Sequence, residues 1–207
     1  MAVPAENLVI ESWKEYNLIM QKINLSRKNG WVNRLIEKIA PLEQIGDEQS
    51  GYEQYEICPE DNPNRKEVIL RWTRDFLLLA GEQWTDLGFQ DNGSTERDLN
   101  NFKLLAFTRN PNLRTIRDLT GDHISHLQMM RDETEWIIRQ KFPEVQAYGY
   151  RLFFHYNPST CLLHINVELH DSPRQGHEFS FDHVIEKLEI PGYYQQDLEI
   201  FKFRPHK

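Results

Sequence analysis

The stretch that most constrains the fold is residues 163–170, where aliphatic and polar residues alternate one by one. Successive side chains of a β-strand point to opposite faces of a sheet, so the alternation predicts a strand with two unlike faces. The aliphatic face is expected to cover a core and consists of Leu163, Ile165, Val167 and Leu169. The polar face consists of His164, Asn166, Glu168 and His170. Such a face either is exposed on the open side of a sheet or lines a site, and the pattern alone leaves both open.

Another strand is predicted immediately before this one. Residues 152–154 are apolar and aromatic, and they lead into His155 and then into Asn157-Pro158-Ser159. Asn, Pro and Ser favour turns, so a turn is expected to join the two strands. His155 is therefore expected at the end of the first strand, next to that turn.

The order of the remaining elements predicts the α+β class, with an antiparallel sheet and helices packed mainly on one face. Strands are predicted at 67–72, 75–80 and 197–204, and helices at 98–110, 121–141 and 181–189. Ser94 or Thr95 could cap the first of these helices, and Thr120 is the predicted N-cap of the long one. Lys141 and Pro143 are expected to close the long helix. His123 and His126 lie in its first turns and are expected to be exposed to solvent.

Composition excludes several classes of protein. The chain has 207 residues and a hydrophobic fraction of 39%, enough for a core of its own. A net charge of −8 argues against an extended nucleic-acid surface but is compatible with a pocket for one nucleotide. The sequence has no apolar run long enough for a membrane span and no signal-peptide pattern, so we expect a cytoplasmic protein, with the nucleus as the other location. Cys58 and Cys161 are isolated and are expected to be reduced thiols.

Three parts are predicted along the chain. Residues 43–66 are acidic and contain Gly, Pro and Asn, which is typical of a loop or an insertion. This segment separates an N-terminal arm, residues 1–42, from the predicted α+β domain at residues 67–207.

Several short motifs carry a resemblance to one family. They are Arg117-Asp118-Leu119-Thr120, His155-Tyr156-x-Pro158-Ser159 directly before the alternating strand, Val184-Ile185-Glu186-x-Leu188-Glu189, Tyr194-Gln195-Gln196, and the tryptophans Trp31 and Trp84. In this order they resemble the C-terminal domain of the scavenger mRNA decapping enzymes, which are histidine triad proteins. The resemblance implies a histidine-triad-like fold for the predicted α+β domain. It also implies that the chain begins near the family's hinge and lacks its N-terminal domain.

The resemblance further implies a reaction and a set of site residues. The family hydrolyses the triphosphate bridge of short capped mRNA fragments through a covalent phospho-histidine, and it needs no cofactor or metal. The nucleophile corresponds to His164, and the phosphate-binding groups correspond to His155, Ser159 and Asn166. Trp31 corresponds to the tryptophan that stacks on the cationic methylguanine. The implied partners are a capped dinucleotide or short capped RNA fragment and a second copy of the chain in a homodimer.

The sequence also departs from the family pattern. Where the family has three alternating histidines, this chain has Leu162, His164 and Asn166. The acid that reads the guanine edge is replaced by Gly81, and a phosphate-binding lysine is replaced by Gln83. Each lost charge-assisted hydrogen bond is expected to cost about 1.5 to 3 kcal/mol.

These departures leave three hypotheses open. The first is an active hydrolase with His164 as nucleophile, and the second is a catalytically decayed relative that binds a nucleotide or a protein. The third is a metal site on the strand face, formed by His164, Glu168 and His170, with His155 as an optional further ligand.

Overall fold

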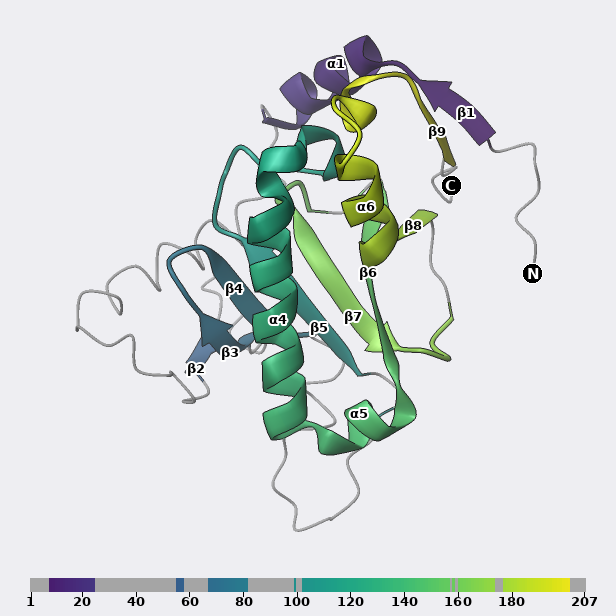
Figure 1. Cartoon of the computed structure of the whole chain (residues 1–207). Helices are drawn as coiled ribbons and strands as arrows, with labels where there is room; N and C mark the ends of the chain where they lie inside the picture. Colours follow the sequence, from purple (N-terminus) through teal and green to yellow (C-terminus); the bar gives the residue numbers. More distant parts are fainter. Residues whose placement is uncertain are drawn as a thin grey trace, which may run out of the picture.

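The computed structural model describes residues 8–24, 55–57, 67–81, 99, 102–156, 158, 160–173 and 177–201. Its main feature is an antiparallel sheet of seven strands in the order β2-β3-β4-β5-β7-β6-β8 (Figure 1). The strands are β2 (Tyr55–Ile57), β3 (Glu67–Trp72), β4 (Phe76–Ala80), β5 (Lys103–Thr108), β6 (Tyr150–Tyr156), β7 (His164–Leu169) and β8 (His177–Ser180). The pairing places β7 between β5 and β6.

Three helices lie on one face of this sheet, as Figure 1 shows. They are α4 (Ile124–Lys141), α5 (Pro143–Tyr148) and α6 (Phe181–Leu188). Leu127, Ile137 and Ile138 of α4 belong to one buried cluster with Ile165 and Val167 of β7. The predicted α+β class, with helices mainly on one face of an antiparallel sheet, is therefore confirmed. No helix in the described part of the chain is both long and apolar enough to cross a membrane.

The alternation in β7 is also confirmed. Its aliphatic residues face the helices, whereas His164, Asn166 and Glu168 lie on the opposite face and are only 8%, 1% and 8% exposed. The possibility of a solvent-exposed polar face is therefore wrong for these three residues. His170 lies beyond the end of β7 and is exposed.

The helix predicted at 98–110 is wrong, because residues Lys103–Thr108 form the strand β5. The strand pairs with β4 on one side and with β7 on the other, and Leu104 and Ala106 are fully buried in the core. Backbone pairing on both sides thus overrides the helical preference of Leu and Ala.

The start of the long helix differs in detail from the prediction. A short 3-10 helix, Gly121–His123, follows Thr120, and α4 itself begins at Ile124. The predicted end is confirmed, because α4 ends at Lys141 and Pro143 occupies the first turn of α5. The expectation that the two histidines are exposed is wrong, since both are half-buried and Nε2 of His126 lies 3.1 Å from Oγ1 of Thr108.

The two ends of the described chain pair in a second, smaller sheet, whose Leu198 and Ile200 belong to the main core cluster. Strand β1 (Leu8–Glu11) pairs with β9 (Leu198–Phe201) in a two-stranded antiparallel sheet, and α1 (Trp13–Asn24) follows β1. Figure 1 shows this smaller sheet at the end of the domain, beyond the start of α4. The pairing joins the predicted N-terminal arm to the last strand of the predicted α+β domain.

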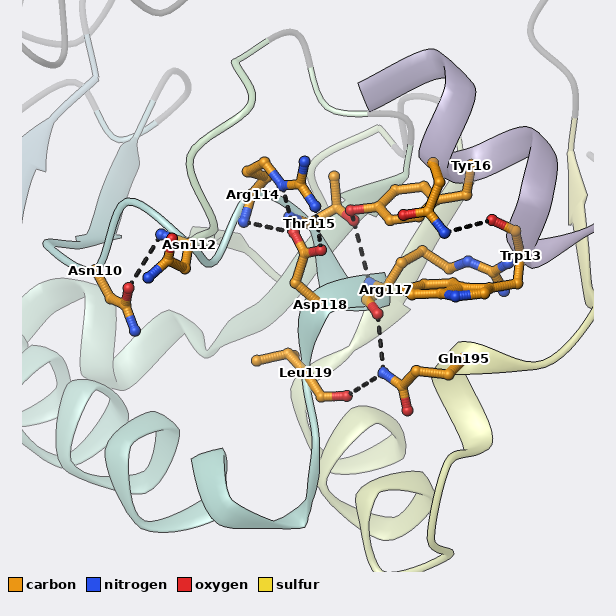
Figure 2. Close-up of polar contacts among 11 residues, drawn as sticks. Trp13, Tyr16, Asn110, Asn112, Arg114, Thr115, Arg117, Asp118, Leu119 and Gln195 are labelled. Atoms are coloured by element: carbon orange, nitrogen blue, oxygen red, sulfur yellow. Dashed lines mark hydrogen bonds and ion pairs between the residues drawn. The ribbon is translucent and has the colours of Figure 1, made fainter. Parts of the chain in front are cut away.

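A buried arginine attaches α1 to the domain. Arg117 is fully buried in the short 3-10 helix Ile116–Asp118, and its guanidinium lies 5.6 Å from the ring centroid of Trp13 and 5.5 Å from that of Tyr16 (Figure 2). Its Nη1 donates to the carbonyl of Gln196 at 2.8 Å, and its Nε lies 3.7 Å from Oε2 of Glu11. One cation therefore links α1, the β1 end and the segment before β9.

Candidate active site

His164, the predicted nucleophile, is the first residue of β7 and lies opposite Phe107 of β5. The two ring centroids are 4.6 Å apart. The imidazole is thus packed against an aromatic ring and 8% exposed, which removes most of the water that would stabilise its charged form.

The protonation state of His164 follows from its surroundings. Burial is the main cause that lowers its pKa to about 4; the hydrogen bond to Leu162 acts in the opposite direction, and His155 and Lys103 lower the pKa further. Nδ1 lies 2.8 Å from the carbonyl oxygen of Leu162, and because a carbonyl can only accept, Nδ1 carries the proton. The ring is therefore neutral at pH 7, with an unprotonated Nε2 that has the lone pair a nucleophile requires.

His155, on β6, lies beside His164 at a narrow pocket. The pocket measures about 10 Å³, enough for roughly one water molecule, and is lined by Arg114, Thr115, Phe154, His155, Pro158, Leu163 and His164. The structure therefore brings together the two histidines that the sequence predicted for one site. Pro158, from the same predicted motif, lies at this pocket as well.

Arg114 is a cation at this pocket that the sequence analysis missed. Its Nε and Nη2 donate to the two carboxylate oxygens of Asp118, at 3.0 and 2.7 Å (Figure 2). This paired contact uses one edge of the guanidinium and fixes its plane, while Nη1 keeps two further N–H donors. Asp118 is the main cause that raises the pKa of Arg114, so the charge is permanent. The spacing of Arg114 and Asp118, four residues apart and opposite in charge, was the available sequence signal.

A chain of ion pairs crosses the polar face of the sheet. Glu168 on β7 lies 3.0 Å from Nζ of Lys103 on β5 and 3.0 Å from Nη2 of Arg151 on β6. Arg151 also pairs with Glu178 on β8, whose other carboxylate oxygen is 4.0 Å from Nε2 of His155. Four neighbouring strands thus alternate basic and acidic side chains, and the series ends at a histidine of the site. The alternation within β7 could not reveal this, because the pairs depend on the register between strands.

Asn166 lies on the same face as His164, one strand repeat further along β7. Its Nδ2 is buried and has no hydrogen-bond partner in the described part of the chain. A buried donor without a partner costs about 1 to 3 kcal/mol, so this amide is a position where an acceptor such as a phosphate oxygen would be stabilised.

Two of the departures from the family pattern have visible structural consequences. The side chain of Leu162 is 3% exposed and packs with Ile69, Leu77, Leu79 and Phe107 in an apolar cluster. At Gly81 there is no room for a side chain, because an added Cβ would lie 2.8 Å from Cβ of Lys103.

The other predicted site residues either lie outside the described part of the chain or do not form the predicted metal site. Trp31 and Ser159 lie outside the described residues, so their predicted roles stay predictions. Within the described residues, no three or more His, Cys, Asp or Glu side chains form a group that could hold a metal ion. The strand-face metal hypothesis therefore finds no ligand set there.

Comparisons with known proteins agree with the sequence motifs. Residues 89–179 match the family described as scavenger mRNA decapping enzyme, C-terminal binding. The chain is similar to the m7GpppX diphosphatase of Caenorhabditis elegans, with 32% identity over 131 residues, 61% of this chain and 39% of the relative. It is 30% identical to that of Mus musculus over 134 residues, 62% of this chain and 36% of the relative. For the Homo sapiens protein the identity is 29% over 134 residues, with the same coverage of 62% and 36%.

These matches confirm the predicted resemblance for the C-terminal part of the relatives. The chain spans less than two fifths of the length of the relatives it matches, at 39% and 36%.

Proposed function

We propose that the chain hydrolyses the triphosphate bridge of short capped RNA fragments, starting from the match of residues 89–179 to the scavenger mRNA decapping enzyme family. The observation that carries the proposal is the neutral His164 with its proton on Nδ1 and its lone pair on Nε2. A buried imidazole in this state can attack phosphorus without first losing a proton.

The proposed reaction has two steps. Nε2 of His164 forms a bond to the phosphorus next to the methylguanosine, and the bond from that phosphorus to the bridging oxygen breaks, which releases the remaining nucleotide as its diphosphate. Water then attacks the phospho-histidine and releases 7-methylguanosine monophosphate. The positive charge that develops on the ring is stabilised through the Nδ1–H bond to the carbonyl of Leu162.

The remaining groups of the site have binding roles in this proposal. Arg114 and His155 would hold phosphate oxygens, and Arg114 would replace part of the positive charge lost from the family pattern. Asn166 would donate its unpaired Nδ2 once a phosphate reaches it. Ser159 would bind phosphate and Trp31 would stack on methylguanine, and both of these roles rest on the sequence resemblance alone.

Three further expectations belong to the same proposal. The ligand and the homodimer rest on the resemblance, whereas the location and the lack of an extended nucleic-acid surface rest on sequence pattern and net charge. The ligand is a capped dinucleotide or a short capped RNA fragment, without an extended nucleic-acid surface. The chain works as a homodimer in the cytoplasm, with the nucleus as a second location.

A second candidate function is a catalytically decayed module that binds a nucleotide or a protein. Two observations favour it. Leu162 replaces a polar position of the family and is packed in an apolar cluster, and the cations Lys103 and Arg151 of the same face are both paired with Glu168. Such a site has fewer charges available for a triphosphate.

Turnover of a capped dinucleotide decides between the two functions. We would assay the purified chain beside His164→Ala and the matched control His170→Ala, which removes an exposed histidine beyond the end of β7. We expect turnover by the wild type and the control, and a loss of at least about a thousandfold in His164→Ala. An inactive wild type that still binds methylguanosine diphosphate would instead support the decayed module. Equal turnover in all three proteins would exclude His164 as the nucleophile.

A further inference from the structure

A second, larger pocket lies at the start of α4. It has a volume of about 340 Å³, within the usual range of small-molecule sites. Its polar lining comes from the β3–β4 turn, the segment after β5, and the beginning of the long helix: Arg74, Asp75, Arg109, Asn110, His123 and His126. None of these residues lines the pocket at His164.

The lining is rich in hydrogen-bond donors. Its charged groups are one carboxylate, that of Asp75, and two guanidinium groups, those of Arg74 and Arg109. Arg109 is held in place by its Nη1, which donates to the carbonyl of Thr73 at 2.8 Å. Oδ1 of Asn110 accepts the backbone N–H of Asn112 at 3.0 Å (Figure 2), so the side of the amide that remains for a ligand is the donor Nδ2.

His123 adds a donor of defined position, and His126 adds a ring of defined orientation. Nδ1 of His123 accepts the backbone N–H of Thr120 at 3.0 Å, so the neutral ring carries its proton on Nε2. His126 is oriented by Thr108, whose Oγ1 lies 3.1 Å from its Nε2. Both rings lie at the N-terminal end of the 18-residue helix α4, where the helix dipole favours an anion.

We infer that this pocket binds the phosphate group of a nucleotide. Guanidinium groups match the geometry of phosphate oxygens, and the arginines, the His123 imidazole and the Asn110 amide supply donors from three segments of the chain. The volume leaves room for more than the phosphate alone. The inference does not depend on the proposed hydrolysis, because it concerns binding at a different set of residues.

The pocket is adjacent to the candidate active site. Leu113, which lines the larger pocket, accepts the backbone N–H of Leu163 at 2.8 Å, and Leu163 lines the pocket at His164. One backbone hydrogen bond therefore joins the walls of the two pockets. A nucleotide at the first site and a phosphate at the second would be neighbours.

The test is binding observed at the pocket itself. We would titrate isotope-labelled protein with inorganic phosphate and, separately, with adenosine 5′-monophosphate, and follow the imidazole resonances of His123 and His126 by NMR. The variant is Arg74→Gln, which removes an exposed guanidinium, and the matched control is Arg139→Gln, an exposed arginine in the last turn of α4.

We expect saturable shifts of both imidazoles in the wild type and in Arg139→Gln, and an affinity about tenfold weaker in Arg74→Gln. Saturation by both ligands would assign recognition to the phosphate group, and saturation by the nucleotide alone would assign it to a phosphate carried on a nucleoside. Unchanged resonances with both ligands, or equal weakening in the two arginine variants, would overturn the inference. His164→Ala should bind as the wild type does, so a failure of the proposed hydrolysis and a failure of this pocket give different results.

Discussion

His164 donates its Nδ1–H to the backbone carbonyl of Leu162, two residues earlier in the chain, over 2.8 Å. The tautomer of the candidate nucleophile is thus set by a main-chain group, which any residue at position 162 supplies. The loss of a histidine side chain at this position therefore leaves the orientation of His164 intact. What is lost is the polar side chain, since that of Leu162 packs among apolar residues.

The low pKa of His164 predicts a pH dependence of stability. Its folded pKa of about 4 lies below the ordinary value of 6.5, so the unfolded chain binds more protons between these two values. The free energy of unfolding therefore falls as the pH falls from about 6.5 towards 4, and the part due to His164 is about 2 kcal/mol between pH 7 and pH 5. Urea unfolding at both pH values, for the wild type and for His164→Gln, measures it. The variant should lose about 2 kcal/mol less than the wild type over this interval, and identical losses would show that the ring is not buried in its neutral form.

Arg114 is predicted to hold substrate phosphate. Replacing it by Gln removes the permanent charge beside His155 and His164, and we expect kcat/KM for a capped dinucleotide to fall by about ten- to a hundredfold. Arg114→Lys should recover only part of the loss, because an ammonium keeps the charge but not the planar donors that Asp118 orients.

Arg139→Gln is the matched control for overall charge, and thermal unfolding of each variant monitors the fold. Arg114→Gln could instead lose stability but keep the wild-type kcat/KM and the wild-type affinity for methylguanosine diphosphate. This result would show that Arg114 has a structural role only.

The sequence pattern correctly predicted those helices and strands whose apolar residues repeat with a clear period or whose ends carry residues that stop the element. The one-by-one alternation at 163–170 identified β7 and its two faces, and Lys141 with Pro143 marked the end of α4. The same approach assigned Lys103–Thr108 to a helix, because a short apolar run is compatible with both the helical period and the strand period. Only the pairing of this segment with β4 and β7 shows that it is a strand.

The candidate site was predictable only for residues that the family motifs mark. The motifs identified His155 and His164, and the structure places both at one pocket. The ion-pair series from Lys103 to Glu178 depends on the register of four strands, which no single segment encodes. The anchoring of α1 through Arg117 likewise depends on Glu11, more than a hundred positions away in the sequence.

Arg117 and Glu11 are predicted to be necessary for stability. Arg117 is fully buried, and Glu11, which also accepts the hydroxyl of Tyr156, is 6% exposed. Breaking a buried ion pair by removing one partner typically costs about 3 to 5 kcal/mol, so Arg117→Gln should lower the free energy of unfolding by that amount. Arg131→Gln breaks an exposed pair with Asp132 on α4 and should cost less than about 1 kcal/mol. Urea unfolding measures both, and equal losses in the two variants would contradict the anchoring role.

Gly81 is predicted to be required by the close approach of β5. Its backbone N–H donates to the carbonyl of Lys103 at 2.7 Å, and an added Cβ would lie 2.8 Å from Cβ and 3.1 Å from the carbonyl oxygen of the same residue. A methyl group forced into this space displaces backbone, so Gly81→Ala should lower the free energy of unfolding by about 1 to 3 kcal/mol. Gly81→Asp, which restores the acid of the family pattern, should be destabilised at least as much and should not gain affinity for methylguanine nucleotides.

Gly121→Ala provides the comparison, since its Cβ would approach only the carbonyl oxygen of Leu188, at 3.2 Å, on an exposed 3-10 helix. Urea unfolding should rank its loss of stability below that of Gly81→Ala, and fluorescence titration with methylguanosine diphosphate measures the affinity of Gly81→Asp. A stable Gly81→Asp variant with tighter nucleotide binding would show that β5 can move away from position 81, and that the acid of the family pattern can be accommodated there.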